Sequence, residues 1–170
     1  MKYIEAIDSV NVETNEISVF LAGGITGTSD WQKELIKKIK HLDLTILNPR
    51  RKQFDLNDPK QSVSQIVWEF DYLRIADFII FWFCKETVCP ITLYELGTHS
   101  MLNKPLIIGI DKEYKRKIDV EVQMKLARPE IEIVYSLDDV AKQVDYWHRF
   151  LSNKTRMCNL KPMETIGIKD

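Results

Sequence analysis

The hydrophobic run at residues 78–84, FIIFWFC, most constrains what this chain can fold into. Seven consecutive apolar residues leave no polar side for solvent, so a strand at this position must be buried on both faces. Strands of this kind belong to parallel sheets that helices cover on both sides. The run is also far below the roughly 20 residues that a membrane-spanning helix needs, so we expect no membrane partner.

Apolar runs and amphipathic segments alternate along the rest of the chain. Short apolar runs predict strands at 17–23, 44–49, 78–83, 105–110 and 131–135. Helical spacing predicts helices at 29–42, 62–76 and 120–127, in the segment that carries Glu95, and at 136–151. In the second of these, the apolar residues lie at 63, 66, 67, 70 and 73. Ser29 or Asp30 is placed to cap the first helix, and Ser136 with Asp139 resembles a weak capping box.

Five buried strands that alternate with helices predict one α/β domain, a doubly wound sandwich with a five-stranded parallel sheet of the flavodoxin or Rossmann kind. We assign residues 1–151 to this domain and residues 152–170 to a C-terminal tail. The 24 basic and 25 acidic residues give a net charge of −1, which does not indicate a nucleic-acid partner. The three cysteines and three histidines share no metal-ligand spacing, so we expect a reduced, cytoplasmic protein without a metal or an organic cofactor.

In doubly wound sheets the ligand binds at the carboxyl ends of the strands. The residues that follow the predicted strands are therefore candidates for substrate binding: Gly23, Gly24, Ile25, Asn48, Arg50, Cys89 and Thr92. The glycine cluster AGGITGT matches neither the dinucleotide fingerprint nor the Walker loop. Two adjacent glycines still favour close approach of the backbone to a ligand, and the alternative is an ordinary tight turn.

Three carboxylates border the central predicted strand. Glu69 and Asp71 lie near the end of the helix before it, and Glu95 lies in the first turns of the helix after it. A carboxylate near a helix N-terminus is stabilised as the anion by about 0.3–1 kcal/mol, which keeps it available as a nucleophile. Two carboxylates about 5 Å apart support retaining glycosyl chemistry. The alternative is that Glu95 only satisfies backbone amides at the start of its helix.

Four motifs in order carry a family resemblance: VFLAGGITG, LTILNPRR, WEFDYLRIAD and PITLYELG. The chain resembles the nucleoside 2-deoxyribosyltransferase family, and in particular its deoxyribosyltransferase-like branch, from about Val19 to Ile110. The resemblance implies that Glu95 attacks C1′ of a 2′-deoxynucleoside, expels the base and holds the sugar as an ester until a second base attacks. It implies a proton donor for the departing base, and either Glu69 or Asp71 fits that role.

The resemblance also places Gly23, Gly24 and Ile25 against the sugar or base, and Asn48 and Arg50 in the loop after the second strand. The chain departs from the family at Thr26, where members that cleave monophosphates have an arginine. It departs again at Cys89, where the family has aspartate or serine. Arg50 or Arg51 offers a replacement partner for a phosphate. Related sites are often completed by a neighbouring subunit, so we expect a homo-oligomer, with Trp147, Phe150 and the tail as candidate contacts.

Three functions fit these residues. The first is transfer of 2-deoxyribose from a deoxynucleoside to a free nucleobase. The second is hydrolysis of the same N-glycosidic bond, with water in place of the second base. The third is a catalytically silent nucleotide-binding module, against which the combination of Glu95 with Glu69 and Asp71 argues.

Overall fold

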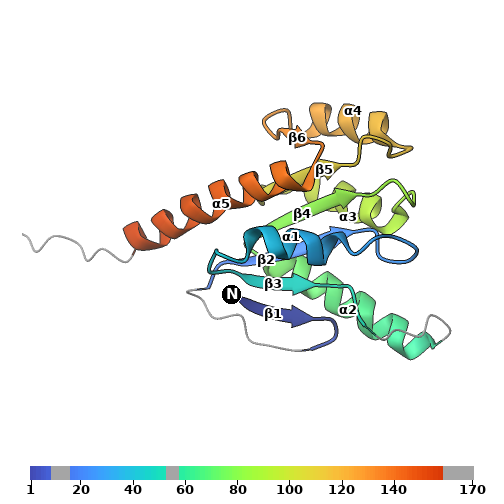
Figure 1. Cartoon of the computed structure of the whole chain (residues 1–170), viewed down its shortest axis with the longest axis horizontal. Coiled ribbons are helices and arrows are strands. Elements are labelled where there is room, and N and C mark those ends of the chain that lie inside the picture. Colours follow the sequence, from blue (N-terminus) through green and yellow to red (C-terminus); the bar gives the residue numbers. More distant parts are fainter. Residues whose placement is uncertain (9–15, 53–57, 159–170) are drawn as a thin grey trace, which may run out of the picture.

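A computed structural model of the chain describes residues 1–8, 16–52 and 58–158 (Figure 1). Its sheet has six parallel strands in the order β1-β3-β2-β4-β5-β6. The strands are β1 (Lys2–Glu5), β2 (Ser18–Gly23), β3 (Thr45–Asn48), β4 (Phe78–Phe83), β5 (Leu106–Ile110) and β6 (Ile133–Val134). All six residues of β4 are buried, as its continuous apolar sequence predicts.

The prediction of five strands was wrong by one strand. The additional strand, β1, lies at the edge of the sheet and pairs with β3 from Lys2↔Thr45 to Glu5↔Asn48. Within β1 only Ile4 is buried, and the exposed Tyr3 precedes it. A four-residue edge strand with one buried side chain has no continuous apolar run, so the sequence pattern does not reveal it.

The other five strands have the 2-1-3-4-5 order of flavodoxin-like sheets, which confirms the predicted architecture. The chain leaves β2, adds β3 on one side of it, and then returns to add β4 on the other side. The carboxyl ends of β2 and β4 therefore flank a topological switch point, where sheets of this class bind ligands.

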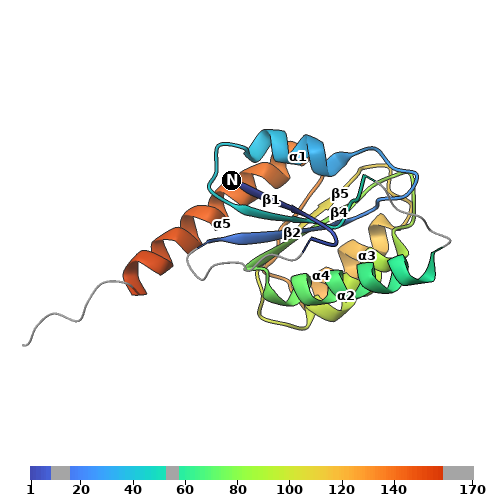
Figure 2. The same cartoon turned by 90° about the horizontal axis from the view of Figure 1, so that it is seen from below.

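Two layers of helices cover the sheet (Figure 2). Helices α1 (Trp31–Ile39) and α5 (Leu137–Cys158) pack together on one face. Helices α2 (Pro59–Ile75), α3 (Pro90–Ser100) and α4 (Lys117–Ala127) cover the other face. Within the described residues, no helix has the length and apolar character that crossing a membrane requires.

α1 and α5 begin at the expected caps, whereas α2 and α4 each begin three residues earlier than predicted. Asp30 caps α1, because its side chain accepts a hydrogen bond from the amide of Lys33 at 3.0 Å. Ser136 and Asp139 exchange hydrogen bonds at the start of α5, as the capping-box pattern predicts. α5 continues beyond residue 151 to Cys158, so part of the predicted tail is helical. The rest of that tail, 159–170, lies outside the described residues.

The orientation of α2 differs from its apolar repeat. Four of the five residues that predict this helix, Val63, Ile66, Val67 and Phe70, are each more than half exposed, and only the fifth, Leu73, is buried. Trp68 and Tyr72 face the sheet instead, where the Trp68 ring lies 5.9 Å from Phe20 and 4.4 Å from Tyr72 between ring centroids. The Trp68 and Tyr72 rings fill the space against the sheet, which leaves Phe70 and the smaller apolar residues on the outside.

The C-terminal end of α2 is held by a residue from the connection between α3 and β5. The ammonium of Lys104 donates hydrogen bonds to the carbonyls of Leu73, Arg74 and Ala76, at 2.8, 2.7 and 2.6 Å. Burial lowers the pKa of Lys104. A cation at this position satisfies carbonyls that have no partner inside the helix and complements the negative end of the helix dipole.

Candidate active site

A cavity of about 490 Å³ opens at the carboxyl ends of β2 and β4, at the switch point of the sheet. This volume lies within the usual range for small-molecule sites. The wall comes from β2 and the loop after it, the start of the loop after β3, α2, and the loop that leads into α3. The lining residues are Phe20, Ala22, Gly23, Gly24, Ile25, Thr26, Pro49, Arg51, Gln65, Glu69, Thr87, Cys89, Pro90, Ile91, Thr92 and Glu95.

Glu95 projects into this cavity from α3. Burial, together with the charge of Glu69, raises the pKa of Glu95 to about 8. The expectation that the helix dipole keeps this carboxylate ionised was therefore wrong. Glu95 is the sixth residue of α3, beyond the first turn in which the dipole acts most strongly, so desolvation in the cavity outweighs it.

Glu69 lines the same cavity from α2. Burial raises its pKa, and a hydrogen bond from the Gln65 amide at 2.7 Å opposes that rise. Because the charge of Glu69 raises the pKa of Glu95, Glu69 ionises first. Between the two pKa values the pair holds one proton, which is the number that one acid and one nucleophile require.

Asp71 lies outside the cavity. Its side chain is exposed on α2, because a step of two residues turns a helix through about 200° and places Asp71 away from Glu69. Of the two candidate proton donors, the structure brings only Glu69 together with Glu95.

The two glycines after β2 are required by packing inside the protein. A Cβ at Gly24 would lie 2.4 Å from the Cys84 sulfur, and one at Gly23 would lie 2.5 Å from the Trp31 ring. The Trp31 indole also donates a hydrogen bond to the Gly24 carbonyl at 3.0 Å. Gly23, Gly24 and Ile25 line the cavity, and the close backbone approach at the two glycines is to neighbouring protein atoms.

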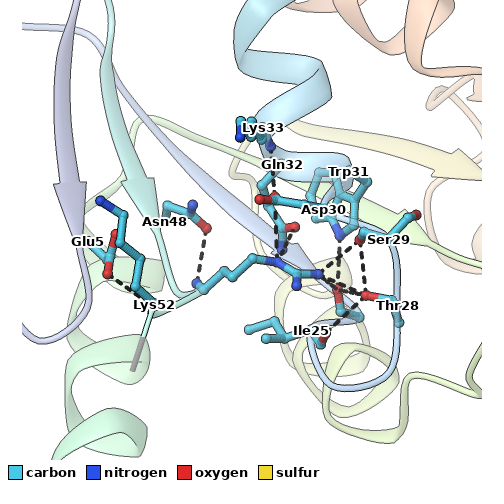
Figure 3. A network of polar contacts seen from close by, with 12 residues as sticks. Glu5, Ile25, Thr28, Ser29, Asp30, Trp31, Gln32, Lys33, Asn48 and Lys52 are labelled. Atoms are coloured by element: carbon cyan, nitrogen blue, oxygen red, sulfur yellow. Dashed lines mark hydrogen bonds and ion pairs between the residues drawn. The ribbon is translucent and has the colours of Figure 1, made fainter. Parts of the chain in front are cut away.

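Arg50 holds the loop between β2 and α1 through hydrogen bonds to Gln32, Thr28 and Ser29, which are labelled in Figure 3. Its Nε donates to Gln32 Oε1 at 2.8 Å, and one terminal nitrogen donates to Thr28 Oγ1 at 2.8 Å and to the Ser29 carbonyl at 3.0 Å. Asn48 is equally engaged: its Oδ1 accepts from the Arg50 amide at 3.0 Å, and its Nδ2 donates to the Tyr3 hydroxyl at 2.8 Å.

Neither Asn48 nor Arg50 is among the lining residues, whereas the next arginine, Arg51, is. Of the two arginines offered as partners for a phosphate, only Arg51 lines the cavity. Arg50 bonds to the loop between β2 and α1, while its neighbour Arg51 lines the cavity. The sequence alone does not indicate which of the two does so.

On the opposite wall, Cys89 and Thr92 lie where α3 begins, and both are buried. Sequence reasoning missed Gln65, which is buried on α2 and donates to Glu69 and to the Pro49 carbonyl at 2.8 Å. The available signal was the i, i+4 spacing of Gln65 and Glu69, which places the two side chains together on a helix.

Fold and site together define a doubly wound α/β protein with two carboxylates in a cavity at the switch point. A family model described as "Nucleoside 2-deoxyribosyltransferase like" matches residues 16–114, more than half of the chain. The chain belongs to this family, which confirms the resemblance of its motifs.

A solved structure is similar in fold, the crystal structure of a conserved protein from Enterococcus faecalis V583. The TM-score is 0.59, and the match covers 78% of this chain and 99% of that one at 14% sequence identity. Similarity at that identity shows the shared fold alone. No functionally curated protein matches the sequence significantly.

Proposed function

We propose that this protein transfers the 2-deoxyribosyl group of a 2′-deoxynucleoside to a second nucleobase through an ester on Glu95. One observation carries the proposal: Glu95 and Glu69 enter the same cavity from two helices, and the charge of Glu69 raises the pKa of Glu95. Two coupled carboxylates with one proton between them supply the nucleophile and the acid of a retaining reaction at an anomeric carbon.

In the first step a lone pair of the Glu95 carboxylate forms the bond to C1′ as the C1′–N bond breaks. The electron pair of that bond leaves with the base, which takes a proton from Glu69. The second base then attacks C1′, its proton returns to Glu69, and Glu95 leaves as the carboxylate. Two inversions at C1′ restore the original stereochemistry.

The raised pKa of Glu95 has a specific consequence for this mechanism. In the free protein the shared proton resides mainly on Glu95, whereas the reaction needs it on Glu69. Positive charge develops at C1′ as the glycosidic bond weakens, and a nearby cation favours the ionised carboxylate. The reacting sugar itself therefore favours the Glu95 anion and transfer of the proton to Glu69.

The remaining lining residues provide the substrate contacts in this proposal. Gly23, Gly24 and Ile25 form the wall against the sugar, and Cys89 and Thr92 form the wall at the start of α3. Arg51 replaces Arg50 as the cation that faces the ligand.

The test is chromatography of a deoxynucleoside panel incubated with and without a different free base. Wild-type protein should produce a new deoxynucleoside, and Glu95→Gln should lose at least about 10³-fold in rate. Free base alone, with equal dependence on Glu95, would establish hydrolysis instead. Absence of cleavage across the panel would favour the third function, a catalytically silent nucleotide-binding module.

Glu69 and Asp71 form a matched pair of variants on α2. Glu69→Gln should lose about 10²–10⁴-fold, the usual contribution of a positioned acid, whereas Asp71→Asn should stay near the wild-type rate. Equal losses in both variants, or a loss confined to Asp71→Asn, would contradict the assignment of Glu69 as the proton donor.

We also propose that the protein is a homo-oligomer whose interface is the outer surface of the layer formed by α2, α3 and α4, called the apolar face below. Its exposed members include Val63, Ile66, Val67, Phe70 and Ile75 on α2, Ile91 and Tyr94 on α3 with Met101 at its C-cap, and Ile118, Val122 and Leu126 on α4. Patches of this kind mark protein interaction sites. Ile91 also lines the cavity, so a partner bound here would adjoin the candidate active site.

A second copy fits the apolar face because charges of both signs accompany it. Asp71 and Arg74 are exposed on α2, and Asp119 and Lys125 are exposed on α4. In a two-fold contact each can meet the opposite sign on the other copy. Analytical ultracentrifugation at micromolar concentration should show a dimer or a larger assembly for the wild type.

Phe70→Glu should dissociate that assembly, while Lys37→Glu on the opposite layer should leave it intact. An assembly insensitive to Phe70→Glu would instead favour α5, where Tyr146, Trp147 and Phe150 pack against one another with ring centroids 5.5–6.4 Å apart.

A further inference from the structure

Two thiols lie side by side at the wall of the cavity. The sulfur atoms of Cys84 and Cys89 are 3.6 Å apart, and both cysteines are free and buried. Cys84 directly follows β4, and Cys89 directly precedes α3, the helix that carries Glu95. The pair therefore spans the loop that connects the central strand to the nucleophile's helix.

The backbone at Cys89 does not suit a cysteine on local grounds. Its φ of 47° is left-handed, and it occupies the N-cap of α3 without a side-chain capping bond. Glycine, asparagine or aspartate would adopt this conformation more easily, and the latter two would also cap the helix. What cysteine supplies at this position is its sulfur atom.

The two sulfurs differ in access and in acidity. Cys89 lines the cavity, whereas Cys84 lies beneath Gly24, at which a Cβ would come within 2.4 Å of the Cys84 sulfur. A hydrogen bond from the Cys84 thiol, aided by the backbone amides of Cys84 and Gly24, lowers the pKa of Cys89. The same hydrogen bond and burial raise the pKa of Cys84. Such an asymmetric pair has an attacking thiol that solutes can reach and a resolving thiol behind it.

We propose that Cys84 and Cys89 are a redox modification site that a hydroperoxide converts into a disulfide. The Cys89 thiolate attacks the outer peroxide oxygen, the O–O bond breaks, and the departing oxygen takes a proton and leaves as water or alcohol. The Cys84 sulfur then attacks the Cys89 sulfenic acid and expels hydroxide, which leaves as water with the Cys84 proton. Two thiols are oxidised by two electrons and one peroxide is reduced.

Disulfide formation acts on the candidate active site through α3. The sulfurs must approach from 3.6 Å to about 2.05 Å. This movement draws the first turn of α3 toward the end of β4, and Pro90, Ile91 and Thr92 in that turn line the cavity. The oxidised protein is therefore the less active form, a consequence that rests on the proposed function.

The test is intact mass and peptide mapping of the wild-type protein after treatment with hydrogen peroxide, followed by denaturation and N-ethylmaleimide. The reduced chain should accept three maleimides. The oxidised chain should accept one and contain a peptide pair joined through Cys84 and Cys89. The Cys158→Ser protein should go from two maleimides to none, which keeps the third cysteine out of the linkage. Three free thiols after treatment, or a linkage through Cys158, would overturn the site.

A second variant tests whether oxidation of Cys89 precedes disulfide formation with Cys84. In Cys84→Ser, dimedone should trap a sulfenic acid on Cys89, whereas the wild type should yield the disulfide and little dimedone adduct. Cys84→Ala provides the same measurement if the serine variant does not fold. A dimedone adduct on neither variant would contradict the role of Cys89 as the attacking thiol.

The effect on catalysis is measured separately as base release by reduced, oxidised and re-reduced wild type. Oxidation should lower the rate at least about tenfold, the effect of a displacement near 1 Å, and dithiothreitol should restore it. An unchanged rate in fully disulfide-bonded protein would overturn the link to α3. A reduced protein that cleaves nothing would refute the proposed function, while the mass measurement would still decide the disulfide.

Discussion

The two helical layers of this protein cover the same sheet in different ways. In α1, Leu35 and Ile39 face the sheet while Lys33, Glu34 and Lys37 face solvent, so the helix has one apolar side. The layer of α2, α3 and α4 is apolar toward the sheet and also on its outer surface. The first layer has only to cover the sheet. The second also contains the cavity and its carboxylates, and its outer surface fits a role in contact with another protein.

The largest expected effect tests the simple role of the first layer. Leu35→Ala should lower the free energy of unfolding by about 2–5 kcal/mol, because it leaves a cavity in a fully buried part of the core. Val67→Ala on α2 should change it by no more than about 0.5 kcal/mol in the monomeric protein. Urea unfolding at protein concentrations below assembly compares the two. A large decrease in the free energy of unfolding for Val67→Ala would show that the exposed apolar residues of α2 belong to the core.

The second prediction concerns the stability that the second layer loses by burying Glu95. The pKa of Glu95 is about 8 in the folded protein, against 4.5 ordinarily. Between these values the folded protein holds a proton that the unfolded chain has released, so this group's contribution to stability falls as pH rises. Glu95→Gln removes that fall. Its stability relative to wild type should grow from near zero at pH 4.5 to on the order of 2–4 kcal/mol at pH 8.

Urea unfolding of wild type and Glu95→Gln at one-unit pH intervals measures this difference. Parallel profiles for the two proteins would show that Glu95 is not buried as an acid. In a Glu69→Gln background, Glu95→Gln should change the free energy of unfolding over a narrower pH range, because the charge of Glu69 raises the pKa of Glu95.

A smaller effect on stability is expected at Arg50. This residue lies in the connection from β3 to α2 and bonds to α1 and to the loop before it. Arg50→Ala should lower the free energy of unfolding by about 1–3 kcal/mol, since it removes charge-assisted hydrogen bonds to Gln32 and Thr28. Arg51→Ala, its neighbour, should instead weaken ligand binding more than stability. Thermal unfolding with and without a deoxynucleoside separates the two effects, and interchangeable behaviour of the two arginines would refute the assignment.

The smallest effect is expected at Gly97 on α3. A Cβ there meets nothing within 4 Å, so Gly97→Ala should stabilise the protein by about 0.5–1 kcal/mol through helix propensity. Gly24→Ala should destabilise by about 1–3 kcal/mol, because the new methyl group would overlap the Cys84 sulfur. Melting temperatures that shift in the same direction for both glycines would contradict this packing.

Sequence reasoning was most successful where one physical requirement dominates. The continuous apolar run of β4 admits only a strand buried on both faces, and the alternation of such runs with helices predicted a doubly wound parallel sheet. It was least successful where two alternatives have the same pattern. The apolar repeat of α2 identifies a helix but not which side faces the sheet, and the spacing of Arg50 and Arg51 does not indicate which one faces the cavity.

The ionisation state of Glu95 could not be predicted from the sequence for a different reason. Its position in the helix suggested stabilisation of the anion, but its pKa depends on burial and on Glu69, 26 residues earlier in the chain. Only the folded arrangement brings α2 and α3 together around one cavity. Similarly, the pairing of Cys84 with Cys89 depends on the shape of the loop between them.

The contact between Lys104 and the end of α2 has a mechanical consequence for the carboxylate pair. α2 carries Glu69, α3 carries Glu95, and Lys104, four residues after α3, is bonded to three carbonyls at the end of α2. These hydrogen bonds of the ammonium resist sliding of α2 along α3. Lys104 lies outside the cavity, yet its bonds help to fix the relative position of the two helices that carry the carboxylates.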